Sequence, residues 1–87
     1  MKVTVWDTYV KKKNGETMHF DILAPECIKD EAVIHEMGKE YLATKSQAGQ
    51  QLSAKECRLC HQEIASEEML ESLQTRGYYI IEMEGCG

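Results

Sequence analysis

Basic residues are scarce in this sequence. Ten Lys and Arg side chains stand against fifteen Asp and Glu, and the net charge is −5. Because nucleic-acid binding depends on clustered basic residues that meet phosphates, this balance argues against a nucleic-acid partner. The only basic run, Lys11 to Lys13, lies beside a predicted turn and is typical of a solvated loop.

No signal peptide and no long apolar run is visible in the sequence. Polar and acidic side chains interrupt the first residues, Met1 to Asp7, and no stretch approaches the length of a membrane span. We therefore expect a cytoplasmic protein that does not bind membranes. Thiols stay reduced in the cytoplasm, so the four cysteines are expected to be thiols and not disulfides: Cys27, Cys57, Cys60 and Cys86.

The common catalytic templates are absent as well. No P-loop, G-x-S-x-G elbow or G-x-G-x-x-G turn occurs in the chain. This leaves the question of an enzyme open but favours a non-enzymatic protein.

The pattern of apolar residues predicts a single α+β domain over residues 1–87, because a chain of this length has room for one core. It begins with a β-hairpin around Asn14-Gly15, a dipeptide that suits turns with positive φ. A two-residue turn would pair Lys13 with Glu16, and this register would place Tyr9 opposite Phe20 and Asp7 opposite Ile22. Two alternating apolar rows flank the turn: Val3, Val5 and Tyr9, then Met18, Phe20 and Ile22.

After the hairpin, the pattern predicts the order α-β-α-β. Pro25 ends the second strand, Asp30 and Ser66 are expected to cap the two helices, and Gly77 to end the second one. The complete prediction is one sheet of three or four strands with two helices packed against it. The segment 78–83 is apolar on both faces at its start, which predicts an inner strand. The first helix has an apolar stripe at helical spacing: Ile34, Met37, Gly38, Tyr41 and Leu42.

The segment E-C-R-L-C-H, Glu56 to His61, fits either a helix or a strand, and its alternation favours the strand. The C-x-x-C-H pattern is also that of c-type haem attachment, but haem is attached after export and no export signal is present. A redox dithiol would need an activated thiolate, and no clear activation of Cys57 emerges.

Zinc is the sharper alternative for this segment. Cys57, Cys60 and His61 have the spacing of metal ligands, although only one cysteine pair is present. A further ligand would have to come from elsewhere, with His19 or Cys86 as candidates. The structural alternative is that the cysteines are small buried side chains, and this interpretation ranks slightly ahead of the metal.

A second candidate polar site lies on the hairpin. His19 and Asp21 are two residues apart and share a face, and the predicted register places Thr8 opposite Asp21 and Asp7 among apolar neighbours. A half-solvated sheet face explains these residues most simply. A carboxylate that orients the imidazole, as in metal and acid–base sites, is the functional alternative.

Five blocks of the chain form a recognisable set: V-W-D-T-Y-V (residues 5–10), M-H-F-D (18–21), G-K-E-Y-L (38–42), E-C-R-L-C-H (56–61) and G-Y-Y-I-I-E-M-E-G-C (77–86). In these blocks the chain resembles a family of short bacterial proteins known as a domain of unknown function. The resemblance implies a small α+β domain and carries over no activity. It marks the polar residues already discussed as the family's signature positions.

These observations predict a binding or interaction module with structural cysteines and no cofactor. Its partner would be an unknown protein or small molecule, and the chain would be a monomer or a homodimer. The first alternative is a zinc-binding module that uses the C-x-x-C-H segment. The second is a small thiol-redox or hydrolytic enzyme that uses His19, Asp21 and the cysteines.

Overall fold

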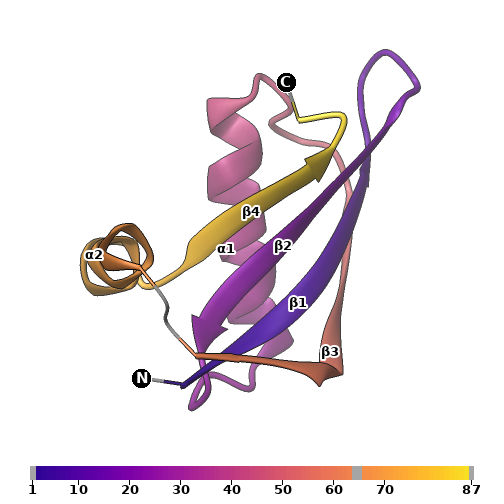
Figure 1. Ribbon diagram of the computed structural model, residues 1–87. Coiled ribbons are helices and arrows are strands. Elements are labelled where there is room, and N and C mark those ends of the chain that lie inside the picture. The colour runs from indigo at the N-terminus through magenta and orange to yellow at the C-terminus, as the bar shows by residue number, and fades with distance from the viewer. Residues whose placement is uncertain (1, 64–65, 87) are drawn as a thin grey trace.

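The computed structural model describes the backbone of residues 2–63 and 66–86, and the side chains of residues 3–56 and 66–86. Within these residues, one antiparallel sheet has the strand order β3-β1-β2-β4, and two helices pack against it (Figure 1). The predicted α+β class and element order are confirmed, including a strand at Glu56–His61. The elements are β1 (Lys2–Lys11), β2 (Thr17–Pro25), α1 (Glu31–Thr44), β3 (Leu52–Glu63), α2 (Glu67–Thr75) and β4 (Tyr79–Glu84).

The β1–β2 hairpin forms where Asn14-Gly15 predicts it, but the predicted register is wrong by one residue. The Lys12 N–H donates to the Glu16 carbonyl over 2.7 Å, so three residues, not two, form the loop. Gly15 has a φ of +89°, which favours glycine. Asn-Gly suits both loop lengths, and the apolar rows could not distinguish them.

The corrected register changes which side chains face each other. Asp7 lies opposite Asp21 and Tyr9 opposite His19, whereas Thr8 lies opposite Phe20. Since opposite residues of an antiparallel pair share a face, Asp7 joins the face of His19 and Asp21 and Thr8 joins the other.

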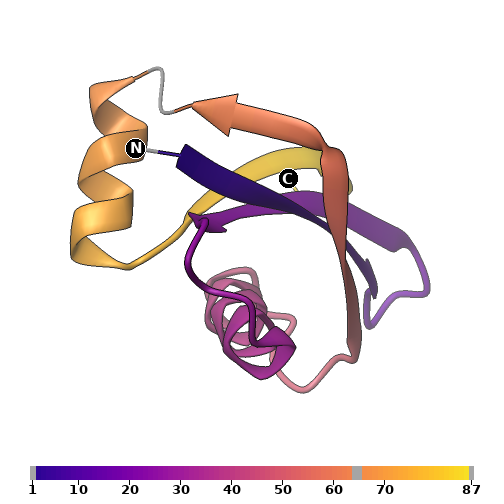
Figure 2. The same cartoon turned by 90° about the horizontal axis from the view of Figure 1, so that it is seen from below.

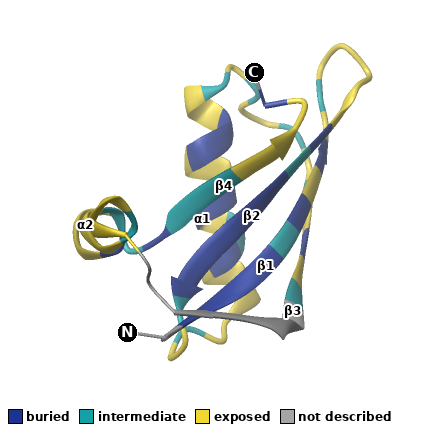
Figure 3. Cartoon of the chain, in the orientation of Figure 1, coloured by how far each residue is buried: buried dark blue, intermediate teal, exposed yellow. Residues whose placement is uncertain are grey.

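The main core lies between one face of the sheet and α1, seen edge-on in Figure 2. The helix starts after Asp30, whose carboxylate accepts from the Ala32 N–H over 2.9 Å. Its buried residues are the predicted stripe at helical spacing. Burial is concentrated on β1, β2 and the inner side of α1 (Figure 3). The sheet contributes six apolar side chains of β1 and β2 to this core: Trp6, Val10, Met18, Phe20, Ile22 and Ala24.

Helix α2 covers only one end of the opposite face. Its Leu73 packs against Val3, Val5 and Leu23, and the Ser66 hydroxyl caps it by accepting from the Met69 N–H over 3.2 Å. In the described residues, no helix covers the other half of this face, which carries the polar residues. Neither helix in the described residues has the length and apolar character needed to cross a membrane.

Strand β4 pairs only with β2 among the described residues, so it is an edge strand. The prediction of an inner strand is therefore wrong. The apolar pattern has a different cause, since both faces of the strand are covered at its start. Tyr78 and Ile80 contact the core beneath α1, while Tyr79 and Ile81 contact the cluster beneath α2.

Candidate functional site

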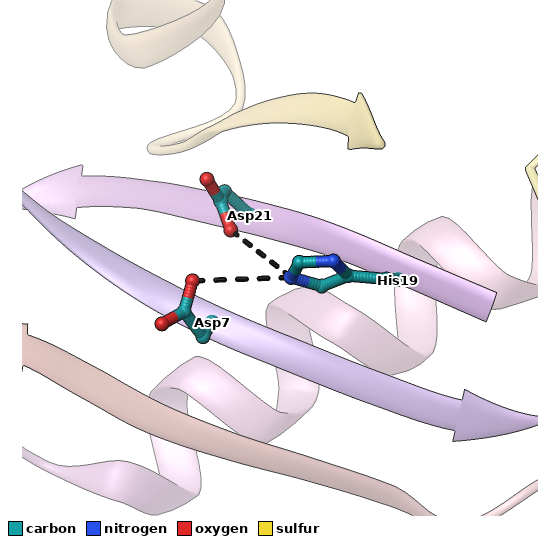
Figure 4. Close-up of side chains that lie close together, drawn as sticks. All are labelled: Asp7, His19 and Asp21. Carbon is teal, nitrogen blue, oxygen red and sulfur yellow. Dashed lines mark ion pairs between the residues drawn. The ribbon is translucent and has the colours of Figure 1, made fainter. Parts of the chain in front are cut away.

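Asp7, His19 and Asp21 converge on the open half of the sheet (Figure 4). The Nε2 atom of His19 lies 3.7 Å from Oδ1 of Asp21 and 3.9 Å from Oδ1 of Asp7. Each residue offers one potential ligand atom, and the three atoms lie within 4.8 Å of one another. Two neighbouring strands therefore present one imidazole and two carboxylates to a common point.

Two atoms of this cluster are buried and have no hydrogen-bond partner among the described residues. They are Nε2 of His19 and Oδ1 of Asp21. The Asp21 side chain is only 10% exposed, whereas that of Asp7 is 44% exposed. Leaving a buried polar atom unpaired destabilises a fold by about 1–3 kcal/mol, so two such atoms that face each other call for a functional explanation.

The electrostatics of the cluster favour a cation. Burial of Asp21, together with the hydrogen-bonding and repulsive influence of the Asp7 carboxylate, raises the pKa of Asp21 to about 6, and His19 opposes this effect. Two carboxylates at this separation repel each other unless a proton or another positive charge lies between them. A divalent cation would neutralise both.

Both the ring and the backbone of His19 have a contact partner. Tyr9 stacks on it with the ring centroids 4.3 Å apart and an interplanar angle of 7°. On the other face of the sheet, the Cys86 thiol donates to the His19 carbonyl oxygen over 3.3 Å. The stacking limits rotation of the imidazole, whereas the thiol contact holds only the backbone of His19.

The three potential ligand atoms are close to the spacing of a bound metal. Ligands about 2.0–2.1 Å from a tetrahedral zinc ion lie roughly 3.3 Å apart. The distances from His19 of 3.7 Å and 3.9 Å would have to shorten by roughly half an ångström. The three atoms lie within 4.8 Å of one another, so Asp7 and Asp21 would both have to move toward a bound ion, and three protein ligands would leave one position of a tetrahedral ion open.

The model of a protein family described as a domain of unknown function, DUF2024, matches residues 1–83. The chain belongs to this family. A solved structure with similarity to this DUF2024 domain is the NMR structure of protein NE1680 from Nitrosomonas europaea. It is 34% identical, each chain is covered over 100% of its length, and the TM-score is 0.77. No curated protein matches the sequence.

The structure of this DUF2024 domain separates some residues that the sequence analysis grouped. Thr8 is fully buried on the α1 face and donates to the Trp6 carbonyl over 3.1 Å, so it lies away from Asp21. Cys86 is buried in the core on the α1 face, whereas the His19 imidazole lies on the opposite face. These two side chains therefore do not form a common ligand set. Cys27 is exposed, and the side chains of Cys57, Cys60 and His61 lie outside the described residues.

Sequence reasoning missed a second polar group, on the α1 side of β4. The Tyr41 hydroxyl donates to Glu82, and Lys45 lies 2.9 Å from the same carboxylate. Lys45 and Tyr41 hold the pKa of Glu82 below its usual range, and burial raises that of Tyr41. The spacing of Tyr41 and Lys45, one helical turn apart, was visible in the sequence, but their partner on β4 was not.

Proposed function

We propose that this protein is a binding module for a divalent transition metal such as zinc, with Asp7, His19 and Asp21 as ligands. The observation that carries the proposal is the pair of buried, unpartnered atoms, His19 Nε2 and Asp21 Oδ1, 3.7 Å apart and facing each other. An imidazole and two carboxylates suit zinc and its neighbours among the divalent metals. The two negative charges of the carboxylates balance the two positive charges of one such ion.

Metal binding would require Asp21 to be ionised. Because its pKa is raised to about 6, the affinity for metal should fall as the pH drops through that value. At neutral pH the site would be ready to bind. At the metal's open position, a water molecule or a group from a partner could complete the coordination.

The broader expectations from the sequence belong to the same proposal. The protein would act in the bacterial cytoplasm as a non-enzymatic module that binds neither nucleic acid nor membranes. The acidic composition and the absence of common catalytic templates support this view.

The deciding experiment is calorimetric titration of chelator-treated protein with zinc at pH 7.5. We expect one ion per chain, with binding lost in Asp21→Asn and in His19→Gln. The matched control is His35→Gln, because His35 lies on α1 outside the cluster. Melting with zinc at 100 times the dissociation constant should show stabilisation by about 2.7 kcal/mol in the unaltered protein. Binding that survives both cluster variants would refute this assignment of the ligands.

The C-x-x-C-H segment is a separate candidate for zinc and is tested in the same series. Cobalt bound through cysteine gives an intense sulfur-to-metal charge-transfer band, whereas nitrogen and oxygen ligands do not. We expect a cobalt spectrum without that band, and one that is unchanged in Cys57→Ser/Cys60→Ser. A charge-transfer band that disappears in the double variant would place the metal at the cysteines instead.

A further inference from the structure

The free edge of β4 lies at the bottom of a hollow between the two helices. The hollow has a volume of about 640 Å³ and is lined by residues from α1, α2 and β4. Because α1 and α2 pack on opposite faces of the sheet, a space that touches both must pass around the edge of the sheet at β4 (Figure 1). The two helices thus form the walls of a trough along an edge strand.

An edge strand offers unpaired N–H and C=O groups to any extended chain that can reach it. In the described residues, few side chains form hydrogen bonds with the backbone of β4. The Ser72 hydroxyl donates to the Tyr78 carbonyl over 2.7 Å, just before the strand begins. From Tyr79 onward, no side-chain hydrogen bond to the backbone of the strand occurs until the Cys86 thiol donates to the Glu84 carbonyl.

The charge of the trough indicates which kind of chain it would bind. Its lining contains four glutamates against one lysine and one arginine. On the α1 side, Glu82 of β4 is paired with Lys45, and Glu40 of α1 accepts from the neutral Tyr78 hydroxyl over 2.8 Å. On the α2 wall, Glu68 and Glu71 are exposed and form no ion pair with another described residue. Arg76, at the C-terminal end of α2, also lines the trough, so each side keeps a net negative charge, the α1 side through Glu40 and the α2 side through Glu68 and Glu71.

The same charges disfavour pairing of β4 with a second copy of this chain. The strand carries Glu82 and Glu84 and no basic residue. Two β4 edges side by side would bring four glutamates onto one short ribbon between further acidic walls. Like charges on neighbouring strands are destabilising, so the edge is better suited to a partner of opposite charge.

We propose that the edge of β4 binds an extended basic segment of a partner protein, which adds to the sheet as a further strand. Main-chain hydrogen bonds to β4 would supply the affinity, as in other cases of strand addition. Side chains of an extended segment alternate between the two faces, so every second residue would lie on the face that α2 covers at one end. Lys or Arg at the positions nearest α2 would meet Glu68 and Glu71.

The test uses two labelled eight-residue peptides of identical composition, four lysines and four threonines each. One alternates the two residues and the other carries them in blocks of four. We expect fluorescence anisotropy to show that the alternating peptide binds at least about fivefold more tightly. In ¹⁵N-labelled protein, it should shift amide signals along β4 and on the facing sides of α1 and α2. The same peptide with N-methylated backbone amides should not bind.

A double variant, Glu68→Gln/Glu71→Gln, should weaken the alternating peptide by about two- to tenfold, since each exposed ion pair contributes modestly. The matched control is Glu26→Gln/Glu36→Gln, which removes two exposed charges outside the trough and should leave affinity unchanged. Equal binding of both peptides, or equal affinity of both double variants, would overturn the proposal. So would a homodimer in sedimentation that excludes the peptide, since the second copy would then be the occupant.

Discussion

Replacing Asp21 by Asn should make the metal-free protein more stable at neutral pH. The pKa of this carboxyl is raised from 3.8 to about 6 in the folded protein, mainly because burial and the Asp7 carboxylate disfavour its charged form. A change of this size corresponds to at most about 3 kcal/mol. The neutral amide of Asn has no such penalty and can donate a hydrogen bond to Asp7.

The pH dependence follows from this raised pKa. Below pH 3.8 the Asp21 carboxyl is protonated in both the folded and the unfolded protein, so it contributes no difference. Between 3.8 and about 6, the unfolded chain releases the proton while the folded chain retains it, and the free energy of unfolding decreases as the pH rises. Above about pH 6 the loss is complete. Asp21→Asn should therefore match the unaltered protein near pH 4 and exceed it by about 1–3 kcal/mol at pH 7.5.

Urea denaturation in the presence of a chelator measures both values. The fluorescence of Trp6, the single tryptophan and only 3% exposed, reports unfolding. Glu26→Gln is the control, because Glu26 is exposed and should change stability little at either pH. If Asp21→Asn were less stable than the unaltered protein at pH 7.5, the carboxylate would have a structural partner and the reasoning would fail. With zinc at about 1,000 times the dissociation constant, which stabilises by about 4.1 kcal/mol, the order should reverse, since only the unaltered protein gains the stabilisation of a bound ion.

Three further substitutions test the fold by the same denaturation assay. Gly85→Ala should lower the free energy of unfolding by about 2 kcal/mol or more, because Gly85 has a φ of +67° and an added Cβ would lie 2.6 Å from the Thr17 carbonyl oxygen. Unchanged stability would contradict this backbone geometry. Phe20→Ala should lower the free energy of unfolding by about 3–5 kcal/mol, since Phe20 is fully buried in the core beneath α1. A decrease of less than about 1 kcal/mol would argue against that core. Ser66→Ala should cost about 1 kcal/mol by removing the cap on the Met69 N–H, while Ser66→Asp should retain it; equal losses in the two variants would speak against a capping role.

The two helices and their caps could be predicted from the sequence because their signals are local. Asp30 and Ser66 cap the helices as predicted, and the stripe from Ile34 to Leu42 is the buried side of α1. Within one helix, spacing alone decides which residues share a face. No information about distant parts of the chain is needed.

The candidate site could be predicted only in part, because it depends on pairing between strands. His19 and Asp21 share a face in any register, so their proximity was predictable. Asp7 joins them only because the loop contains three residues, and Asn14-Gly15 suits loops of two or three. The prediction of an inner position for β4 was wrong for a related reason. Its apolar residues are buried beneath two helices, one on each face, and not between two neighbouring strands.

The alternation of β2 makes this domain a two-sided scaffold for redesign. Met18, Phe20 and Ile22 are fully buried on one side, while His19 and Asp21 stand between them on the other. Along β2, the residues that form the core therefore alternate with the residues of the candidate site and lie on the opposite face. A designer could exchange the open-face residues for another set of ligands, to change the preferred ion, without rewriting the interior beneath α1.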